Sequence, residues 1–302
     1  MSNSSNVSSD NSSRKLKDES PLLSSIKWLI SGGFGGVCTI VVGHPFDIVK
    51  VRLQTSKSGF YTGSFDVVKK IFSQNGFFGL YQGFIPPLLG TIPIISVTFC
   101  GYDFSKFLIR NISGVSSELT TQHIVLAGFL SAIPATVVTA PFERIKIILQ
   151  IQGQREKNKF NGTYDVLKHL YKTDGIRSIF RGTYLTFARD GPGCAIYFGV
   201  YETTKKYMLH DSDKLSIGTT IIAGGLSGIA MWSVMFPVDT VKSVIQGSSN
   251  IDVKTACTTL YRQGGISRFF PGFGPAILRA FPANSASFLG VEVVHRILDN
   301  LF

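Results

Sequence analysis

Six stretches of the chain are apolar and long enough to cross a lipid bilayer as helices. A transmembrane helix needs about 20 mostly apolar residues, and each stretch reaches this length although proline, glycine or a charged residue interrupts it. Polar groups at membrane depth are expected to face protein or water. The pattern therefore predicts an all-α membrane protein with six transmembrane helices. They span approximately residues 26 to 54, 84 to 109, 120 to 150, 184 to 208, 216 to 246 and 275 to 299.

A motif of proline, acid, lysine and glutamine ends the first, third and fifth apolar stretches. Its copies start at Pro45, Pro141 and Pro237, each 96 residues after the one before. A period of this length indicates three supersecondary units within one body. We therefore expect three tandem repeats of about 96 residues with pseudo-threefold symmetry. The expected boundaries are a disordered polar tail at residues 1–25 and repeats at residues 26–112, 119–209 and 215–302.

A polar stretch between the two helices of each repeat ends in two glycines seven residues apart. The pairs are Gly76 with Gly83, Gly175 with Gly182, and Gly265 with Gly272. An amphipathic run, such as residues 65 to 72, precedes the pair. Such a run is typical of a short helix that lies on a membrane surface, so each repeat is expected to contain one surface helix.

The acid and lysine of the repeated motif lie on one helical face, where a local pair would contribute only about 0.3 kcal/mol. Three copies beside prolines at equal depth instead favour a ring of ion pairs between helices, in which each lysine meets the acid of the next repeat. The motif glutamines are expected to hydrogen-bond to these pairs. The members of this inner ring are Asp47, Lys50, Glu143, Lys146, Asp239 and Lys242, with Gln54, Gln150 and Gln246 as braces.

The second, fourth and sixth helices contain a weaker copy of the same charge pattern, which predicts an outer ring at their far ends. Two rings that close in turn would open a central cavity to each side alternately, as in other transporters built from repeats. The third copy has histidine where the others have lysine, so this ring is expected to close weakly. The outer ring consists of Asp103, Lys106, Glu202, Lys205, Glu292 and His295.

Charged residues also lie deep in two of these helices. Thirteen residues before the outer-ring acids stand Gly90, Arg189 and Arg279, about 20 Å further in, and Asp190 follows Arg189. Charge at this depth is costly unless it is paired or serves a polar substrate. A structural pair between Asp190 and either arginine is one interpretation; a substrate site for a carboxylate and a cation is the preferred one. His44 is a further candidate near the cavity floor, although a lone histidine on an apolar face is more often a packed core residue.

Composition supports a membrane protein and argues against other classes. Hydrophobic residues make up 44% and charged residues 16%, and the mean hydropathy is +0.22, which is unusual for a soluble protein. The net charge of +11 is spread along connecting segments, which fits acidic lipid better than nucleic acid. Neither a P-loop nor a nucleophile elbow nor a metal-type cysteine spacing is present. We expect no enzyme activity, no cofactor, no metal and no nucleic-acid partner.

From about residue 26 to 302, the three PX[DE]XX[KR] motifs resemble those of the mitochondrial carrier family. This resemblance implies a monomer in the inner mitochondrial membrane, with both termini toward the intermembrane space. The inner ring would be the matrix gate, the outer ring the cytoplasmic gate, and the three surface helices would lie on the matrix side. It also implies cardiolipin contacts through backbone amides at helix ends. The glycines at these ends are Gly63, Gly83, Gly162, Gly182 and Gly272.

Within that family, residues 43–47, 143–146, 149–152, 188–190 and 279–284 resemble the carriers that exchange acylcarnitine for carnitine, an antiport that serves fatty acid oxidation. The resemblance implies that Arg279 binds the carboxylate of carnitine and Asp190 its quaternary ammonium group, with assistance from Arg189. Carriers of ornithine and other basic amino acids share these charges and form the alternative. They have an acid where this chain has Ile94, which with Pro93 would offer an apolar wall to an acyl chain.

Two further alternatives follow from the residues themselves. A proton-leak or regulatory membrane protein would not need the substrate arginines. A soluble helical repeat protein would have to bury six apolar segments without lipid.

Overall fold

The computed structural model describes residues 21–114, 119–154, 160–208, 217–248 and 251–301, and every regular element in this part of the chain is helical. The first long helix begins at Pro21, where a proline is favoured because the first helical position needs no N–H. It therefore starts earlier than the expected boundary at residue 26, and the rest of the expected polar tail lies outside the described residues. The long helices are α2 (Pro21–Thr55), α4 (Ile85–Ser113), α5 (Thr121–Gln150), α7 (Thr183–Met208), α8 (Ile217–Gln246) and α10 (Phe273–Leu301).

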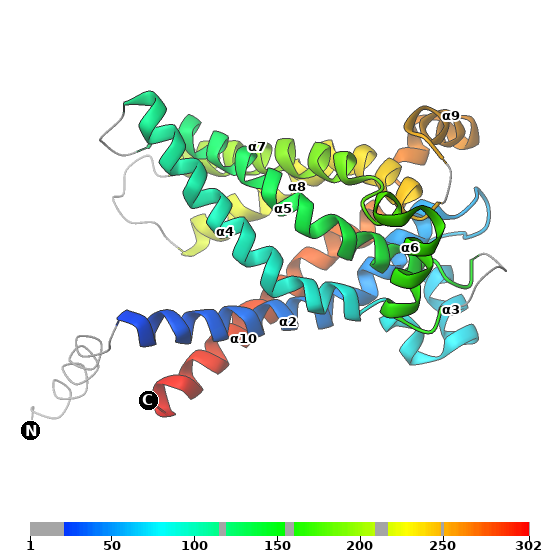
Figure 1. Ribbon diagram of the computed structural model, residues 1–302, viewed down its shortest axis with the longest axis horizontal. Helices are drawn as coiled ribbons and strands as arrows, with labels where there is room; N and C mark the ends of the chain where they lie inside the picture. The colour runs from blue at the N-terminus through cyan, green and yellow to red at the C-terminus, as the bar shows by residue number, and fades with distance from the viewer. Residues whose placement is uncertain (1–20, 115–118, 155–159, 209–216, 249–250, 302) are drawn as a thin grey trace, which may run out of the picture.

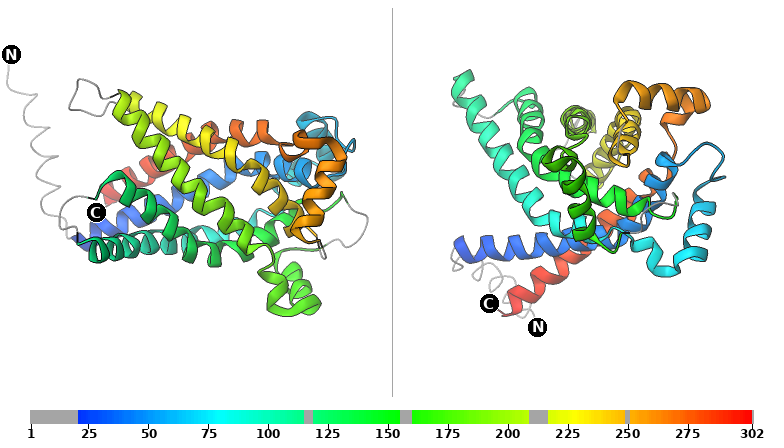
Figure 2. Two further views of the ribbon diagram at one scale, coloured as in Figure 1. Left: turned by 90° about the horizontal axis from the view of Figure 1, so that it is seen from above. Right: turned by 45° about the vertical axis from the view of Figure 1, so that its right-hand side comes forward.

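The long helices run side by side as a bundle, with the short helices gathered at one end (Figure 1). The start of α2 and the end of α10 lie at the opposite end, and the ribbons diverge toward it (Figure 2). α4 packs against α5, α7 against α8, and α10 against α2, so each repeat is joined to its neighbour and the bundle closes on itself. This is the six-helix, three-repeat architecture that the sequence predicts. The short elements are α3 (Ser64–Asn75), α6 (Thr163–Ile179), α9 (Val253–Gly264) and the 3₁₀ turns η1 (Phe77–Tyr81) and η2 (Gly265–Phe269).

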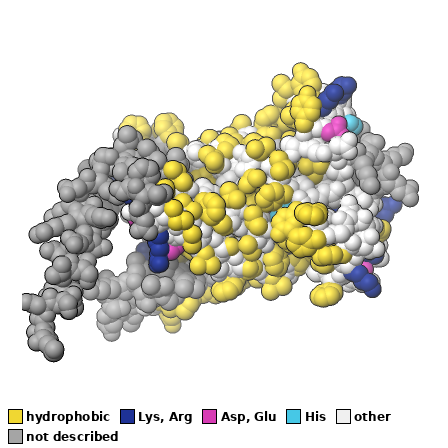
Figure 3. Space-filling view, turned by 90° about the horizontal axis from the view of Figure 1, so that it is seen from below, with side chains coloured by type: hydrophobic (Ala, Val, Ile, Leu, Met, Phe, Trp, Pro, Cys, Tyr) yellow, Lys and Arg dark blue, Asp and Glu magenta, His cyan; other side chains and the backbone are white. Residues whose placement is uncertain are grey.

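Four helices are apolar and long enough to span a membrane by composition alone, within residues 30–55, 77–113, 121–150 and 222–246. α7 and α10 have 26 and 29 residues, but the charges that they present to the bundle interior and ends lower their hydropathy. Large apolar side chains such as Phe99, Phe107, Phe281 and Phe288 are exposed on the bundle. Figure 3 shows hydrophobic side chains over the middle of one face and charged ones toward its two ends. This surface suits lipid, as expected of a membrane protein.

Tight packing is found where the first helix of each repeat meets the surface helix of that repeat. In repeat 1, Ile48 and Val49 of α2 pack on Val67 and Ile71 of α3 and on Leu80. Equivalent clusters join α5 to α6 and α8 to α9. The surface helices therefore hold the ends of α2, α5 and α8 in fixed positions, and these ends contain the inner-ring residues.

All six glycines of the predicted pairs adopt a positive φ, between 58° and 84°, a conformation that costs other residues about 1–2 kcal/mol. The second glycine of each pair also lies against the next repeat. A Cβ atom on Gly83 would be 3.0 Å from the Lys146 carbonyl oxygen, and one on Gly272 would be 3.0 Å from Lys50 Cα. A Cβ atom on Gly182 would be 2.9 Å from Gln246 Cγ. Each of these glycines therefore allows the neighbouring helix end to approach closely.

Candidate functional site

Three interhelical ion pairs join the ends of α2, α5 and α8. Nζ to carboxylate oxygen distances are 2.6 Å for Lys146–Asp47, 2.7 Å for Lys50–Asp239 and 2.8 Å for Lys242–Glu143. The structure thus brings all six inner-ring residues together. The predicted direction of pairing is wrong, because each lysine meets the acid of the preceding repeat, not of the next. Three residues of α-helix add about 300° of rotation, so acid and lysine lie on opposite flanks of the cavity-facing surface and the spatial order of the repeats decides which neighbour each one meets.

The three brace glutamines differ in their contacts although all three are fully buried. Gln54 Nε2 donates to Asp239 Oδ2 at 2.9 Å. Gln246 reaches the ring indirectly, because its Nε2 donates to Thr186 Oγ1 at 3.3 Å and that hydroxyl donates to Glu143 at 3.3 Å. The side-chain amide of Gln150 has no hydrogen-bond partner in the described structure. The sequence therefore predicts a direct brace correctly for one repeat of three.

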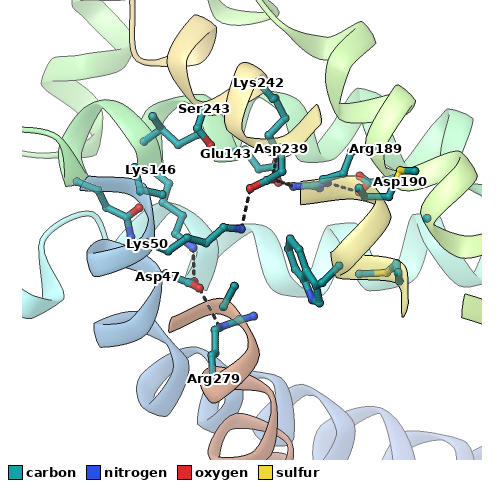
Figure 4. A pocket seen from close by; sticks show the side chains of 18 of the residues that line it. Asp47, Lys50, Glu143, Lys146, Arg189, Asp190, Asp239, Lys242, Ser243 and Arg279 are labelled. Carbon is teal, nitrogen blue, oxygen red and sulfur yellow. Dashed lines mark hydrogen bonds and ion pairs between the residues drawn. The ribbon is translucent and has the colours of Figure 1, made fainter. Parts of the chain in front are cut away.

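A cavity of about 330 Å³ lies against the inner ring. Five of the long helices contribute to its walls, and Figure 4 shows the labelled charged side chains that surround it. Arg189, Asp190 and Arg279 line it, as the spacing from the outer ring predicts. The rest of the wall consists of ring residues, Gln150, Ser243 and the apolar residues Val51, Ile147, Gly193, Cys194, Met231, Trp232, Met235 and Ala276.

Arg189 connects the cavity to the inner ring. Its Nε donates to Asp190 Oδ1 at 2.6 Å. Its two terminal nitrogens lie 3.0 Å from Glu143 Oε1 and 3.2 Å from Asp239 Oδ1. The structural pair between Asp190 and Arg189 that the sequence allows is therefore present, and both residues also face the cavity (Figure 4).

Arg279 occupies a different wall, on α10. Its Nε lies 2.9 Å from Asp47 Oδ1. A Cβ atom on Gly43 would be 2.7 Å from the same nitrogen, so the glycine provides the space that the guanidinium group fills. The two arginines thus approach the cavity from α7 and α10 and contact different acids of the ring.

Three predicted substrate residues do not line this cavity. His44 is fully buried, and its Nε2 is 3.0 Å from the Gln82 carbonyl oxygen while its ring stacks on Tyr81. His44 therefore packs against the segment that contains η1, because its position on α2 faces the surface helix. Pro93 and Ile94 lie in the half-buried part of α4, where Ile94 approaches Gly90.

The two lysines of the outer ring pair within their own helices. Lys106 pairs with Asp103 at 2.7 Å and Lys205 with Glu202 at 3.5 Å, each within one helix. Glu292 pairs with Arg296 at 2.7 Å, and His295 Nε2 lies 3.7 Å from Asp299 Oδ2. Lys106 and Lys205 thus pair within their own helices, whereas α2 and α10 are joined at this end by Lys27 and Asp299 at 3.1 Å. One ring is closed and the other is open.

Two arginines that the sequence did not single out, Arg52 and Arg268, tie the ring ends together. Arg52 is 1% exposed, and it donates to the carbonyl oxygens of Gln150 and Gln152 at 2.9 Å and to Gln82 Oε1 at 3.1 Å. Arg268 donates in the same way to carbonyls at the end of α2. Cations at helix C-termini satisfy unpaired carbonyls and favour the helix dipole. In sequence these residues look like ordinary basic residues near membrane ends, so no signal marked them.

Comparison with known proteins gives a consistent result. A family model described as "Mitochondrial carrier protein" matches residues 22–113, 117–212 and 213–301. The chain is 43% identical to the mitochondrial carnitine carrier of Saccharomyces cerevisiae, over 94% of this chain and 91% of the relative. It is 38% identical to the mitochondrial carnitine/acylcarnitine carrier protein of Homo sapiens, over 94% and 98%. It is also 36% identical to mitochondrial magnesium exporter 1 of Drosophila melanogaster, over 90% and 95%.

Proposed function

Because the chain belongs to the mitochondrial carrier family, we propose that it is a transporter of the mitochondrial inner membrane that exchanges acylcarnitine for carnitine. One observation carries this proposal: two arginines and an aspartate line a single cavity against a closed ring of ion pairs. Carnitine has a carboxylate at one end and a quaternary ammonium group at the other, so it needs both signs of charge. Relatives named as carnitine carriers add support.

The charges divide naturally between the two ends of the substrate. Arg279 stands alone on α10, with one acid beside it, and is the partner for the carboxylate. Asp190 lies on α7 and is the counter-ion for the ammonium group, while Arg189 holds Asp190 in place at 2.6 Å. Pro93 and Ile94 lie on α4 outside the ring-side cavity, and we assign them to the path of the acyl chain. His44 packs against η1, which supports a structural role for it.

Transport requires that the two rings close in turn. The closed inner ring lies at the end of the surface helices, which we assign to the matrix side, and the open outer ring lies at the end that contains the beginning of α2. We therefore place both termini toward the intermembrane space. The third outer-ring position holds His295, a weaker base than lysine, which supports an outer gate that closes weakly and allows some uniport. No covalent chemistry is involved in this cycle.

We further propose that the carrier acts as a monomer and binds cardiolipin at the ends of the surface helices. Gly63 and Gly162 precede α3 and α6, and no side chain would obstruct a ligand there, because nothing lies within 4 Å of the position of a Cβ atom. Unpaired N–H groups at a helix N-terminus attract phosphate. Gly83, Gly182 and Gly272 precede the next long helices and complete the predicted lipid contacts.

The experiment is uptake of labelled carnitine into liposomes that contain the purified protein and are preloaded with carnitine, acylcarnitine, ornithine, magnesium or nothing. We expect rapid exchange with carnitine and acylcarnitine and slow uptake into empty liposomes. Exchange with ornithine but not with acylcarnitine would instead identify a basic amino acid carrier. Ile94→Glu tests the same distinction, because an added carboxylate in the acyl path should favour a second cation.

A further inference from the structure

The ammonium group of Lys50 lies in an aromatic environment as well as in the inner ring. Lys50 Nζ is 4.1 Å from the centre of the Trp232 ring and 5.4 Å from that of Phe236. The same nitrogen is 2.7 Å from Asp239 Oδ2. Aromatic faces around a cation are also the means by which proteins recognise quaternary ammonium ligands, and here a carboxylate adds a counter-ion.

This aromatic pair breaks the threefold pattern of the ring. Trp232 and Phe236 lie seven and three residues before the ring acid of repeat 3. The residues at equivalent positions are Ile40 and His44 in repeat 1, and Thr136 and Ala140 in repeat 2. Among the described residues, cation–π contacts to an inner-ring lysine involve Lys50 alone. Closure of the inner ring does not require that one of its three ion pairs differ from the other two. Recognition of a ligand with a single cationic end does require such a difference.

Trp232 is both accessible to a ligand and held in place. It lines the cavity together with Asp190. Its ring centre is 6.1 Å from that of Phe236, which is fully buried and packs edge-to-face on Phe273 at 5.2 Å. α7 and α8 approach closely beside it, where a Cβ atom on Gly193 would lie 3.5 Å from Met231 Cγ. The indole is therefore held in place on the wall of the cavity that Asp190 also lines.

We propose that Trp232 binds the trimethylammonium group of the substrate by a cation–π contact, and that Lys50 Nζ occupies this place while the cavity is empty. This inference rests on the proposed function, because it takes carnitine as the substrate. The cation would lie between the indole face and the Asp190 carboxylate. Lys50 and the substrate compete for the same indole face of Trp232. Substrate binding therefore withdraws Lys50 from Trp232 and weakens the Lys50–Asp239 pair. Binding is thereby coupled to opening of one joint of the inner ring.

The first test measures selectivity for charge. Carnitine is compared with 3-hydroxy-5,5-dimethylhexanoate, in which carbon replaces the nitrogen, as inhibitors of carnitine exchange by the reconstituted full-length protein. The preference for carnitine is expected to fall about tenfold in Trp232→Leu and by less in Trp232→Phe, which keeps an aromatic face. A variant that only loses packing would bind both compounds less well. An unchanged preference in both variants would overturn the proposal.

The second test measures competition by Lys50. Lys50→Gln removes the competing cation, so it should lower the Kd of labelled carnitine about fivefold in the protein with Trp232. The same substitution should leave the Kd unchanged in the Trp232→Leu background. An equal effect in both backgrounds would show that Lys50 does not compete with the substrate for the indole of Trp232.

The outcome for the wild type separates the two hypotheses. A wild-type protein that does not exchange carnitine refutes the proposed function, whatever the variants do. Wild-type exchange with an unchanged charge preference in Trp232→Leu refutes only the role of Trp232.

Discussion

Arg279 Nε lies 2.9 Å from Asp47 Oδ1, while Lys146 Nζ lies 2.6 Å from the other oxygen of the same carboxylate. One ring acid therefore holds both a ring lysine and an arginine of the proposed substrate site. Arg189 has the same relationship to Glu143 and Asp239. We expect a substrate carboxylate that enters the cavity to compete with the ring acids for these arginines, which would link the proposed substrate to the gate through shared ion pairs.

Loss of either end of the substrate site should abolish transport. Arg279→Ala and Asp190→Asn are each expected to lower carnitine exchange at least ~30-fold, because removal of one partner from a buried charge pair costs about 2–5 kcal/mol. Exchange is measured in liposomes after the amount of inserted protein has been equalised. Arg279→Lys, which keeps the charge, is the matched control and should retain more activity. Near-normal exchange by Arg279→Ala or Asp190→Asn would exclude the charge assignment.

The ring acids should matter more to stability than the ring lysines. Asp47→Asn leaves Lys146 and Arg279 facing each other, whereas Lys146→Met leaves Asp47 paired with Arg279. Unpaired buried charge is strongly destabilising, so the melting temperature in detergent should fall at least about twice as far for Asp47→Asn as for Lys146→Met. Equal shifts would mean that the arginine does not share the carboxylate.

The brace glutamines should respond differently to the same substitution. Gln54→Leu removes the hydrogen bond to Asp239 and should destabilise the protein by about 1.5–3 kcal/mol, as expected for a bond to a charged group. Gln150→Leu removes a buried amide without a partner, so its effect should be neutral or stabilising. Thermal unfolding of the two variants side by side is the measurement. A larger loss for Gln150→Leu would contradict the observed geometry.

Gly272 and Gly59 offer a test of close packing between repeats. Both have a positive φ, of 83° and 80°, so alanine at either position carries the same backbone strain of about 1–2 kcal/mol. Nothing lies within 4 Å of a Cβ atom on Gly59, whereas one on Gly272 would be 3.0 Å from Lys50 Cα and its carbonyl oxygen. Gly272→Ala should therefore lower the melting temperature more than Gly59→Ala. Equal shifts would mean that backbone strain alone explains the loss and that close packing at Gly272 contributes nothing.

Arg52 should prove a structural residue. Arg52→Met leaves two buried carbonyls at the end of α5 without their donor, and we expect a loss of about 3 kcal/mol from the hydrogen bonds to a charged group. Arg177, which is exposed on α6, is the matched control, since Arg177→Met should change stability by less than about 0.5 kcal/mol. Unfolding of both proteins in detergent decides the point.

Features that repeat along the chain could be predicted from sequence, and features that break the repeat could not. The ring residues stand at fixed intervals after Pro45, Pro141 and Pro237, so their shared depth was evident. The partner of each lysine depends on the order in which the repeats close, which a linear sequence does not contain. The bounds of the long helices could be predicted to within a few residues, except at the start of α2, because lipid imposes both the length and the polarity of such helices.

Single departures from symmetry needed the structure. Trp232 has no counterpart in the other repeats, so periodicity gave no reason to select it, although a tryptophan seven residues before a ring acid is visible in the sequence. Gly43 looked like part of a family motif until its contact with Arg279 showed the space that it provides. The sequence placed His44 near the cavity by its position alone. The direction in which its side chain points depends on how α2 packs against η1.

The glycines Gly83, Gly182 and Gly272 link the repeats mechanically. Each one begins a long helix of its own repeat and touches the gate-bearing end of the next. A displacement of any one repeat is therefore passed to its neighbour, and because the chain of contacts is circular it returns to its origin. We therefore expect that loosening one ion pair of the inner ring also disturbs the other two, because the three repeats contact one another in a closed circle.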